Sequence, residues 1–373
     1  MLPYGRQSID EQDIEAVAAI LRGDWLTTGP TVTAFEDAIS AATGGHRAVS
    51  CTSGTAALHM AYAAAGVGPG DQVVTTPMTF VATASGASIL GAEIVFADVE
   101  EDTALLDPAA VEALVTDRTK VIAAVDYAGH PADYDALQPI AARVGALTLD
   151  DAAHSVGGTY RGRPVGDLAD LTTLSFFPTK NLTTGEGGAV IAKDAAVAQR
   201  AHEFHFIGLV RDPARFAMTD EGPWHQEVHE LGLNYRLTDL ASALGLSQLS
   251  RLQAFKERRT AITARYNAAL ADIDGLRVPA QRADVDPAWH LYPVRVLDGR
   301  RREIFEKMRE RGIGVQVNYI PVYWHPVYAN LGYQRGMCPN AEAFYAEELS
   351  LPLYPDLTDD QVDQVIETLT GVL

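Results

Sequence analysis

The feature that most restricts the fold of this 373-residue chain is an alternation of short apolar runs with helical patterns in its first half. The expected strands lie at 72–75, 93–97, 120–125 and 146–149, and the expected helices between them lie at 80–90, 108–114 and 133–143. Strands that are apolar on both faces and joined through helices predict a mostly parallel sheet with helices on both sides. The predicted fold class is therefore α/β.

A smaller α+β region is expected after this sheet. A long helical pattern runs from 237 to about 269. The elements expected beyond it are strands at 290–296 and 314–318 and helices at 301–311, 341–349 and 358–369. We place the boundary inside the long helix, which gives a large domain at 1–250 and a small domain at 251–373. Residues 1–30 form an N-terminal arm, with a helix at 10–22 that carries Ile14, Val17, Ala18 and Leu21 on one face.

Acidic residues outnumber basic residues by 49 to 29, which gives a formal net charge of −20. Because nucleic-acid binding needs clusters of Lys and Arg, this composition argues against a nucleic-acid partner. The two cysteines, Cys51 and Cys338, show no metal-binding spacing and fit a reducing cytosol. No apolar segment has the length of a membrane span, and the N-terminus lacks a signal-peptide pattern. We therefore expect a cytoplasmic protein without a membrane or metal partner.

One lysine follows an apolar run at 171–177 that resembles a strand. Pro178 ends this run, and a glycine-bearing loop leads from Lys180 to a second apolar run at 189–192. Burial at the end of a strand would lower the pKa of the lysine and make its neutral amine available to attack a carbonyl group. Taken alone, the same pattern also fits a surface lysine in a hairpin-like loop.

Two more candidate binding groups follow expected strands, namely the carboxylate of Asp151 and the backbone amides at the helix start of Gly54. Asp151 lies two residues past the strand at 146–149, and Gly54 begins a helix after a strand at 47–51. Because ligands bind beyond the carboxyl ends of parallel strands, these residues and Lys180 should converge on one crevice. Asp151 is a candidate to face a pyridine nitrogen, with Asp150 as a competitor, or it caps the following turn.

The helix start at Gly54 is a candidate phosphate site, because exposed amides and the helix dipole attract an anion there. Ser175, five residues before Lys180, can add a hydroxyl group to the same phosphate. Phe80 either stacks on an aromatic ring or belongs to the core. An amine for an aldehyde, a carboxylate for a pyridine nitrogen and an amide-rich phosphate site together predict pyridoxal 5′-phosphate as the cofactor.

The chain resembles the DegT/DnrJ/EryC1/StrS sugar aminotransferases over essentially its whole length. The motifs that carry the resemblance are Trp25-Leu-Thr-Thr-Gly-Pro30, Ser53-Gly-Thr-Ala-Ala-Leu-His59, Asp151-Ala-Ala-His154, Ser175-Phe-Phe-Pro-Thr-Lys180, Gly185-Glu-Gly-Gly188 and Gly232-Leu-Asn-Tyr-Arg-Leu-Thr-Asp239. The resemblance implies the fold of type I PLP-dependent transferases, similar to aspartate aminotransferase. Within the family, Pro3-Tyr-Gly-Arg-Gln7, Asn318-Tyr-Ile-Pro-Val322 and Ser350-Leu-Pro-Leu-Tyr354 resemble the pseudaminic acid branch, which aminates C4 of UDP-linked 4-keto-6-deoxy-N-acetylhexosamines.

This resemblance also implies roles for individual residues, with Lys180 as the Schiff-base lysine. The residues implied to bind the cofactor are Gly54, Thr55, Phe80, Asp151, His154, Ser175, Lys180 and, from a neighbouring subunit, Asn234. The residues implied to line the substrate site are Tyr4, Asp24, Trp25, Leu26, Thr27, Arg236, Gln316, Val317, Asn318, Tyr319 and His325. Arg236 is a candidate partner for a nucleotide diphosphate. Because Asn234 reaches into another subunit, the resemblance implies a homodimer with shared active sites.

Two departures from the branch leave the sugar open. Its members carry His where this chain has Phe177, and the segment 323–326 differs in its aromatic and amide residues. His154, His205 and His325 are each a candidate substrate contact or a structural histidine, and for His205 we favour the structural role.

The implied activity is a ping-pong transamination. L-Glutamate gives its amino group to the cofactor, which becomes pyridoxamine phosphate, and the amine then passes to C4 of the keto sugar. The same fold would serve a dTDP-keto-sugar 3- or 4-aminotransferase or a cyclitol aminotransferase. A dehydratase of this fold carries histidine in place of the lysine, so Lys180 argues against it. A regulator would need a fused DNA-binding segment or a broken site, and a binding protein without PLP would leave the joint placement of Lys180, Asp151 and Gly54 unexplained.

Overall fold

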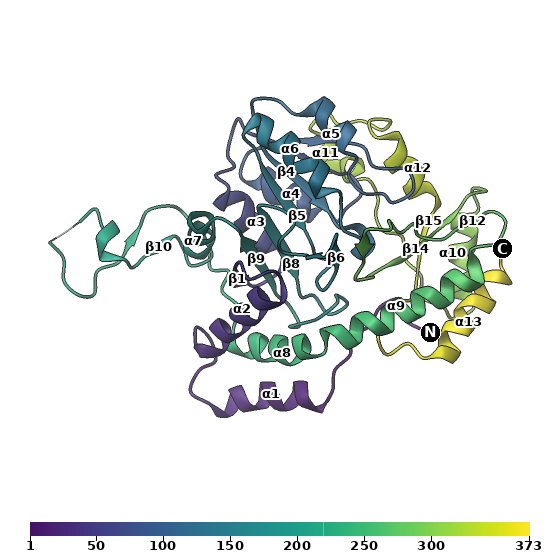
Figure 1. The fold of residues 1–373 in the computed structure, drawn as a ribbon, viewed down its shortest axis with the longest axis horizontal. Coiled ribbons are helices and arrows are strands. Elements are labelled where there is room, and N and C mark those ends of the chain that lie inside the picture. Colours follow the sequence, from purple (N-terminus) through teal and green to yellow (C-terminus); the bar gives the residue numbers. More distant parts are fainter. Residues whose placement is uncertain (219) are drawn as a thin grey trace.

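A seven-stranded sheet in the order β1-β9-β8-β5-β4-β2-β3 is the centre of the computed structural model, which describes residues 1–218 and 220–373 (Figure 1). Its strands are β1 (Arg47–Cys51), β2 (Gln72–Thr75), β3 (Glu93–Phe96), β4 (Thr119–Val125), β5 (Leu147–Asp151), β8 (Leu171–Ser175) and β9 (Gly188–Ala192). Neighbouring strands pair in parallel except around β9, which lies antiparallel between β1 and β8. The predicted α/β class with a mostly parallel sheet is confirmed.

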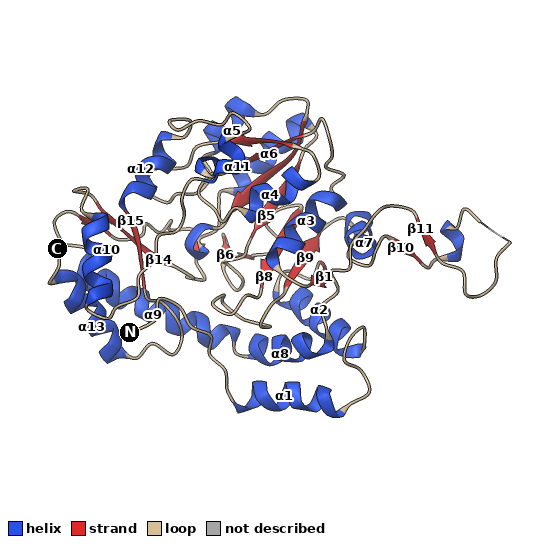
Figure 2. Ribbon diagram, turned by 180° about the vertical axis from the view of Figure 1, so that it is seen from behind, coloured by secondary structure: helices blue, strands red, loops and turns tan. Residues whose placement is uncertain are grey.

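Helices cover both faces of this sheet (Figure 2). Every residue of β2 and of β9 is buried, and successive side chains of a strand point to opposite faces. The covering helices are α2 (Pro30–Ala42), α3 (Gly54–Ala64), α4 (Ala82–Ile89), α5 (Pro108–Leu114), α6 (Tyr134–Val144) and α7 (Ala195–Phe204). Helix α3 packs on β8 and β9, whereas α6 packs on β4 and β5.

A second, antiparallel sheet lies at the other end of the molecule, with the order β12-β14-β15. The elements of this part are α9 (Leu252–Leu270), β12 (Leu276–Arg277), β14 (Tyr292–Val296), α10 (Arg301–Glu310), α12 (Pro339–Glu347), β15 (Glu348–Leu351) and α13 (Asp359–Thr370). Short elements join the two parts, namely β6 (Thr159–Tyr160), β7 (Arg163–Pro164), β13 (Val285–Asp286), η1 (Tyr127–Gly129), η3 (Val322–Trp324) and α11 (Pro326–Ala329). The α+β character agrees with expectation, and the boundary at 250/251 stays a prediction.

Three of the predicted elements are wrong in detail. The helix expected from 237 to 269 is two helices, α8 (Asp239–Ser250) and α9, because Arg251 between them leaves helical geometry at φ −106° and ψ 1°. The strand expected at 314–318 is only an isolated bridge from Gln316 to Ser350, because Gly314 instead bonds to Leu2 of the N-terminal arm. The strand of this region is β15, which begins inside the helix expected at 341–349 and pairs with β14.

Helix α1 (Glu11–Arg22) packs against α8, and its fully buried residue is polar. Asp13 is its buried residue, and the Asp13 carboxylate accepts a hydrogen bond of 2.6 Å from Gln248 and pairs with Arg251. Ile14 and Leu21, on the predicted apolar face, are 52% and 62% exposed. Val17 and Ala18 on the same face are half-buried, so this face is only partly covered in a single copy of the chain.

A long excursion at 206–218 and 220–235, here called the arm, projects away from the main sheet (Figures 1 and 2). It contains β10 (Leu209–Val210), η2 (Pro213–Arg215) and β11 (Glu227–Val228), and an isolated bridge from Phe206 to Asn234 closes its base. Apolar side chains on it are unusually open, with Trp224 at 76% and Leu231 at 92% exposure. Such open apolar surface is typical of a contact with another protein chain.

Within the described part of the chain, we find no helix with the length and apolar character of a membrane span.

Candidate active site

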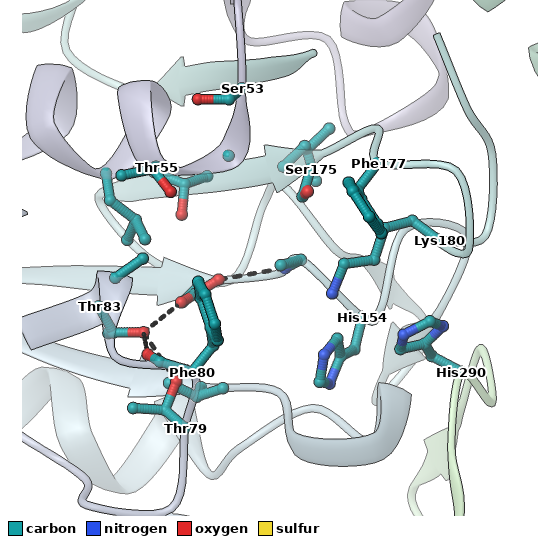
Figure 3. Close-up of a pocket in the computed structure, with 18 of the residues that line it drawn as sticks. Ser53, Thr55, Thr79, Phe80, Thr83, His154, Ser175, Phe177, Lys180 and His290 are labelled. Atoms are coloured by element: carbon teal, nitrogen blue, oxygen red, sulfur yellow. Dashed lines mark hydrogen bonds between the residues drawn. The ribbon is translucent and has the colours of Figure 1, made fainter. Parts of the chain in front are cut away.

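The predicted convergence of strand ends is observed: the carboxyl ends of β1, β5 and β8 open into one cavity of about 580 Å³ (Figure 3). The sequence-predicted residues that line it are Tyr4, Gly54, Thr55, Phe80, Asp151, His154, Ser175, Lys180, Gln316, Asn318 and Tyr319. The cavity thus joins the large sheet to the N-terminal arm and to the segment at 316–319.

One end of the cavity is the N-terminus of α3. Ser53 caps this helix, because its hydroxyl group accepts a hydrogen bond of 3.1 Å from the amide of Ala56. A Cβ atom at Gly54 would lie 2.8 Å from Cβ of Ser175, so only glycine permits β8 to approach this closely. Helix amides, the Ser175 hydroxyl group and Thr55 here surround a space suited to a phosphate group.

Asp151 and Asp150 are the last two residues of β5, paired with Val125 and Ala124, and do not follow the strand as expected. Because neighbouring residues in a strand face opposite sides, only Asp151 lines the cavity. Its Oδ2 atom accepts a hydrogen bond of 2.7 Å from Thr83 Oγ1, and the amide of Ala153 donates to Oδ1 at 3.3 Å. Burial raises the pKa of Asp151, while Thr83, the nearby Lys180 and the Ala153 amide oppose this rise.

Lys180 lies in the loop that joins β8 to the antiparallel strand β9, and the pairing of Ser175 with Gly188 closes this loop. Its backbone amide donates to the carbonyl of Phe177 at 2.9 Å. The side chain points into the cavity, so the surface-lysine alternative is wrong (Figure 3). Burial lowers the pKa of Lys180 to about 8, against the opposing influence of Asp151.

Two phenyl rings lie at the mouth of the cavity, although large apolar side chains are normally buried. Phe80 is 59% exposed and Phe177 is 45% exposed. The ring centroid of Phe80 lies 6.3 Å from that of Tyr319. Phe80 is therefore not a core residue, and both rings are free to contact a planar or apolar part of a ligand.

Asn318 is held by hydrogen bonds on nearly every side. Its side-chain amide donates to Tyr4 Oη at 2.8 Å and to Ser350 Oγ at 3.1 Å. Its backbone carbonyl accepts a hydrogen bond of 2.5 Å from Tyr127 Oη. Its backbone amide donates to Glu348 Oε2 at 2.6 Å. Burial raises the pKa of the Glu348 carboxyl to about 8. The N-terminal arm and β15 thus fix this wall of the cavity together.

His290 is a site residue that sequence reasoning missed, because it lies in a segment interpreted only as a strand. It lines the cavity with its ring centroid 4.5 Å from that of His154. Nε2 of His154 lies 3.2 Å from Tyr319 Oη. Thr83 and Glu186 were missed as well, although in the helix expected at 80–90 Thr83 follows Phe80 by one turn, a spacing that places side chains on one helix face.

The remaining predicted residues do not line this cavity. They are Asp24, Trp25, Leu26, Thr27, Asn234, Arg236, Val317 and His325. Asn234 closes the base of the arm, and the guanidinium group of Arg236 lies 4.1 Å from the ring centroid of Phe206. His205 is buried and contacts the carbonyl of His202, which agrees with the favoured structural role.

A lysine amine facing the cavity, a buried carboxylate at a strand end and an amide-lined helix start are the groups that a type I PLP enzyme needs. The model of the DegT/DnrJ/EryC1/StrS aminotransferase family matches residues 7–370. The chain therefore belongs to this family of PLP-dependent aminotransferases, as its sequence motifs led us to expect. The Gly54–Ser175 approach, Asp151 and Lys180 fit the phosphate, ring nitrogen and aldehyde of the cofactor.

Individual relatives extend over the whole chain. The spore coat polysaccharide biosynthesis protein SpsC of Bacillus subtilis is 40% identical over 378 residues, which cover 100% of this chain and 97% of the relative. A putative sugar aminotransferase from Streptococcus pneumoniae in its PMP form has a TM-score of 0.93 and 32% identity, covering 100% of this chain and 99% of that one. Helicobacter pylori PseC, an aminotransferase involved in the biosynthesis of pseudoaminic acid, has a TM-score of 0.92 and 29% identity, covering 100% and 98%.

Proposed function

We propose that this aminotransferase moves the amino group of L-glutamate to C4 of a UDP-linked 4-keto-6-deoxy-N-acetylhexosamine, in the cytoplasm. The observation that carries the proposal is the Lys180 amine, which lies in a roomy cavity beside Asp151 with a pKa of about 8. The sugar part rests on the similarity to PseC and SpsC, whose names refer to pseudoaminic acid and to a polysaccharide. A dTDP-linked keto sugar, aminated at C3 or C4, or a cyclitol is the alternative acceptor.

When bound, PLP supplies an aldehyde that takes up the amine and a ring that withdraws electrons from the reacting carbon. Lys180 moves the proton between the donor α-carbon and the cofactor, first as a base and then as an acid. A pKa of about 8 suits both roles near neutral pH. Asp151 would hold the proton on the ring nitrogen, and the exposed ring of Phe80 would contact the face of the cofactor ring. In the second half-reaction Lys180 would act in the reverse direction and place a proton on the sugar carbon that receives the amine.

We further propose that two copies of the chain share their active sites. Asn234 and Arg236 lie at the base of the arm and do not line the cavity of their own chain. The open apolar side chains of the arm and of α1 need a partner surface, and a two-fold dimer is the commonest way to provide one. In this arrangement Asn234 of one copy completes the phosphate site of the other, and Arg236 meets the nucleotide diphosphate.

The test is a pair of separated half-reactions. Purified protein loaded with PLP is mixed with L-glutamate, and loss of the visible cofactor band together with release of 2-oxoglutarate reports the first half. Candidate UDP- and dTDP-linked keto sugars are then added, and return of the band identifies the acceptor. A band that no amino donor changes would refute transamination, whereas a donor response without a sugar response would refute only the acceptor.

A further inference from the structure

A buried basic region without an anion lies beside Lys180. His290 is 8% exposed and His154 is 4% exposed, and Nδ1 of each ring is buried without a hydrogen-bond partner in the described structure. Burial, together with the positive charge of Lys180 nearby, holds the pKa of both imidazoles well below the usual range. Both rings are therefore neutral in this state, and the Nδ1 atom of each is unsatisfied.

Arg259 lies behind His290 and adds to this positive region. It is 2% exposed, and among the described residues its guanidinium group pairs with no carboxylate. Instead, Nη1 donates to the carbonyl of Leu353 at 2.8 Å and to that of His290 at 3.5 Å. A buried cation that is held only by carbonyl groups leaves an uncompensated positive potential, which favours a nearby anion.

The cavity offers few other groups that can meet an anion at this end. Of the side chains that line it, only Lys180, His154 and His290 can carry a positive charge. Ser53 and Thr55, at the predicted phosphate site, lie on the far side of Lys180 from the two imidazoles (Figure 3). An anion at His290 is therefore a different group from the cofactor phosphate.

We propose that His290, stacked on His154 and backed by Arg259, binds a carboxylate of the amino donor. This inference rests on the proposed function, because an amino acid donor presents its α-carboxylate next to the amine that Lys180 serves. An arriving carboxylate favours the imidazolium form of His290 and stabilises it by a charge-assisted hydrogen bond. The site takes one proton from solvent as the dicarboxylate binds, and it returns that proton when 2-oxoglutarate leaves. His154, Lys180 and Arg259 are the charged or titratable groups that influence His290, and all three are basic.

The test uses glutarate, which has the two carboxylates of the donor but no amine and so cannot react. Titration calorimetry of the PLP-loaded protein at about pH 8, in two buffers with different ionisation heats, gives the affinity and the number of protons taken up. We expect His290→Asn to weaken glutarate binding by about tenfold or more and to take up fewer protons than the wild type. Asparagine keeps hydrogen-bonding capacity but cannot become a cation. His46→Asn is the matched control, because His46 pairs with Asp167 and neither residue lines the cavity.

The two half-reactions decide between possible occupants. With His290→Asn, the concentration of glutamate needed for half-maximal rate should rise, while the keto-sugar half-reaction keeps its wild-type affinity. Equal glutarate affinity and equal proton uptake in wild type and His290→Asn would overturn the proposal, as would a defect confined to the sugar half-reaction. If His290→Asn does not fold, Arg259→Met tests the same positive region. Failure of the acceptor assignment leaves the glutarate result unaffected, so the two proposals fail independently.

Discussion

Thr83 donates a hydrogen bond of 2.7 Å from Oγ1 to Oδ2 of Asp151, the carboxylate that faces the cofactor ring in the proposed site. This contact opposes the burial that raises the pKa of Asp151. Removing it in Thr83→Val raises that pKa further, so less Asp151 is ionised at neutral pH. A hydrogen bond to a charged group contributes about 1.5–3 kcal/mol, so we expect transamination to slow by roughly tenfold or more. The rate of the glutamate half-reaction should fall most at low pH, because Asp151 becomes protonated there first.

The matched control for this change is Thr172→Val. Thr172 lies on β8 with its hydroxyl group buried and unpaired, so valine removes no hydrogen bond there. The control should keep wild-type rates and at least wild-type stability. Equal effects of the two substitutions would show that Thr83 acts through packing alone.

Lys180→Ala removes the amine that moves the proton. We expect the rate of each half-reaction to fall by about 10²–10⁴-fold or more, since this is the usual contribution of a positioned acid or base. Lys180 serves as a base only when neutral, and its pKa is about 8. The wild-type glutamate half-reaction should therefore accelerate as pH rises toward about 8 and then level off. A rate independent of pH between 6 and 9 would contradict this role.

Gly54→Ala places a methyl group 2.8 Å from Cβ of Ser175 and 2.9 Å from its hydroxyl oxygen. Because real Cβ atoms do not approach so closely, β8 or the start of α3 must shift, and the phosphate site opens. We expect weaker retention of PLP, measured as the half-life of the cofactor band during dialysis. Gly68→Ala is the control, because a Cβ atom there meets no atom within 4 Å. Retention by Gly54→Ala equal to that of the control would contradict the phosphate assignment.

Glu348→Gln changes how stability depends on pH. Burial raises the pKa of Glu348 to about 8, so the folded protein holds this proton more tightly than the unfolded chain does. The contribution of Glu348 to stability is complete below the unfolded pKa of about 4.3 and is lost as pH rises through about 8. Glutamine cannot ionise, so the stability of the variant relative to the wild type should increase as pH rises, by on the order of 5 kcal/mol at pH 8. Melting temperatures from pH 5 to 9 measure this, and parallel curves would contradict it.

Shared active sites predict complementation between two inactive chains. In a mixed dimer of Lys180→Ala with Asn234→Ala, one site carries both defects and the other carries neither. An equal mixture that exchanges freely should regain roughly a quarter of wild-type activity, because half of the dimers are mixed and each has one intact site. Asn234→Ala alone should lose most of its PLP affinity. No recovery in a mixture proven to contain mixed dimers would refute the shared site.

The cofactor side of the cavity could be predicted from sequence, because its residues follow strands that buried apolar runs reveal. Lys180, Asp151 and Gly54 occupy strand ends or a helix start, and the sheet brings them together. The small sheet was harder to predict, since Gly314 pairs with the distant Leu2 and not with a sheet neighbour. His290 was missed for the same reason: its role depends on His154 and Arg259, which approach it only in the folded chain.

The pairing of Ser175 with Gly188 closes a loop that holds two kinds of residue. All three residues lie outside the strands, but the Lys180 amide is held by the backbone carbonyl of Phe177, whereas the side chains of Phe177 and Glu186 line the cavity. Substitutions at these two positions therefore alter what the cavity accepts and leave the lysine where it is. During evolution, such a loop allows the acceptor to diversify while the chemistry stays unchanged, and it gives protein engineers a place to begin when they want a different sugar.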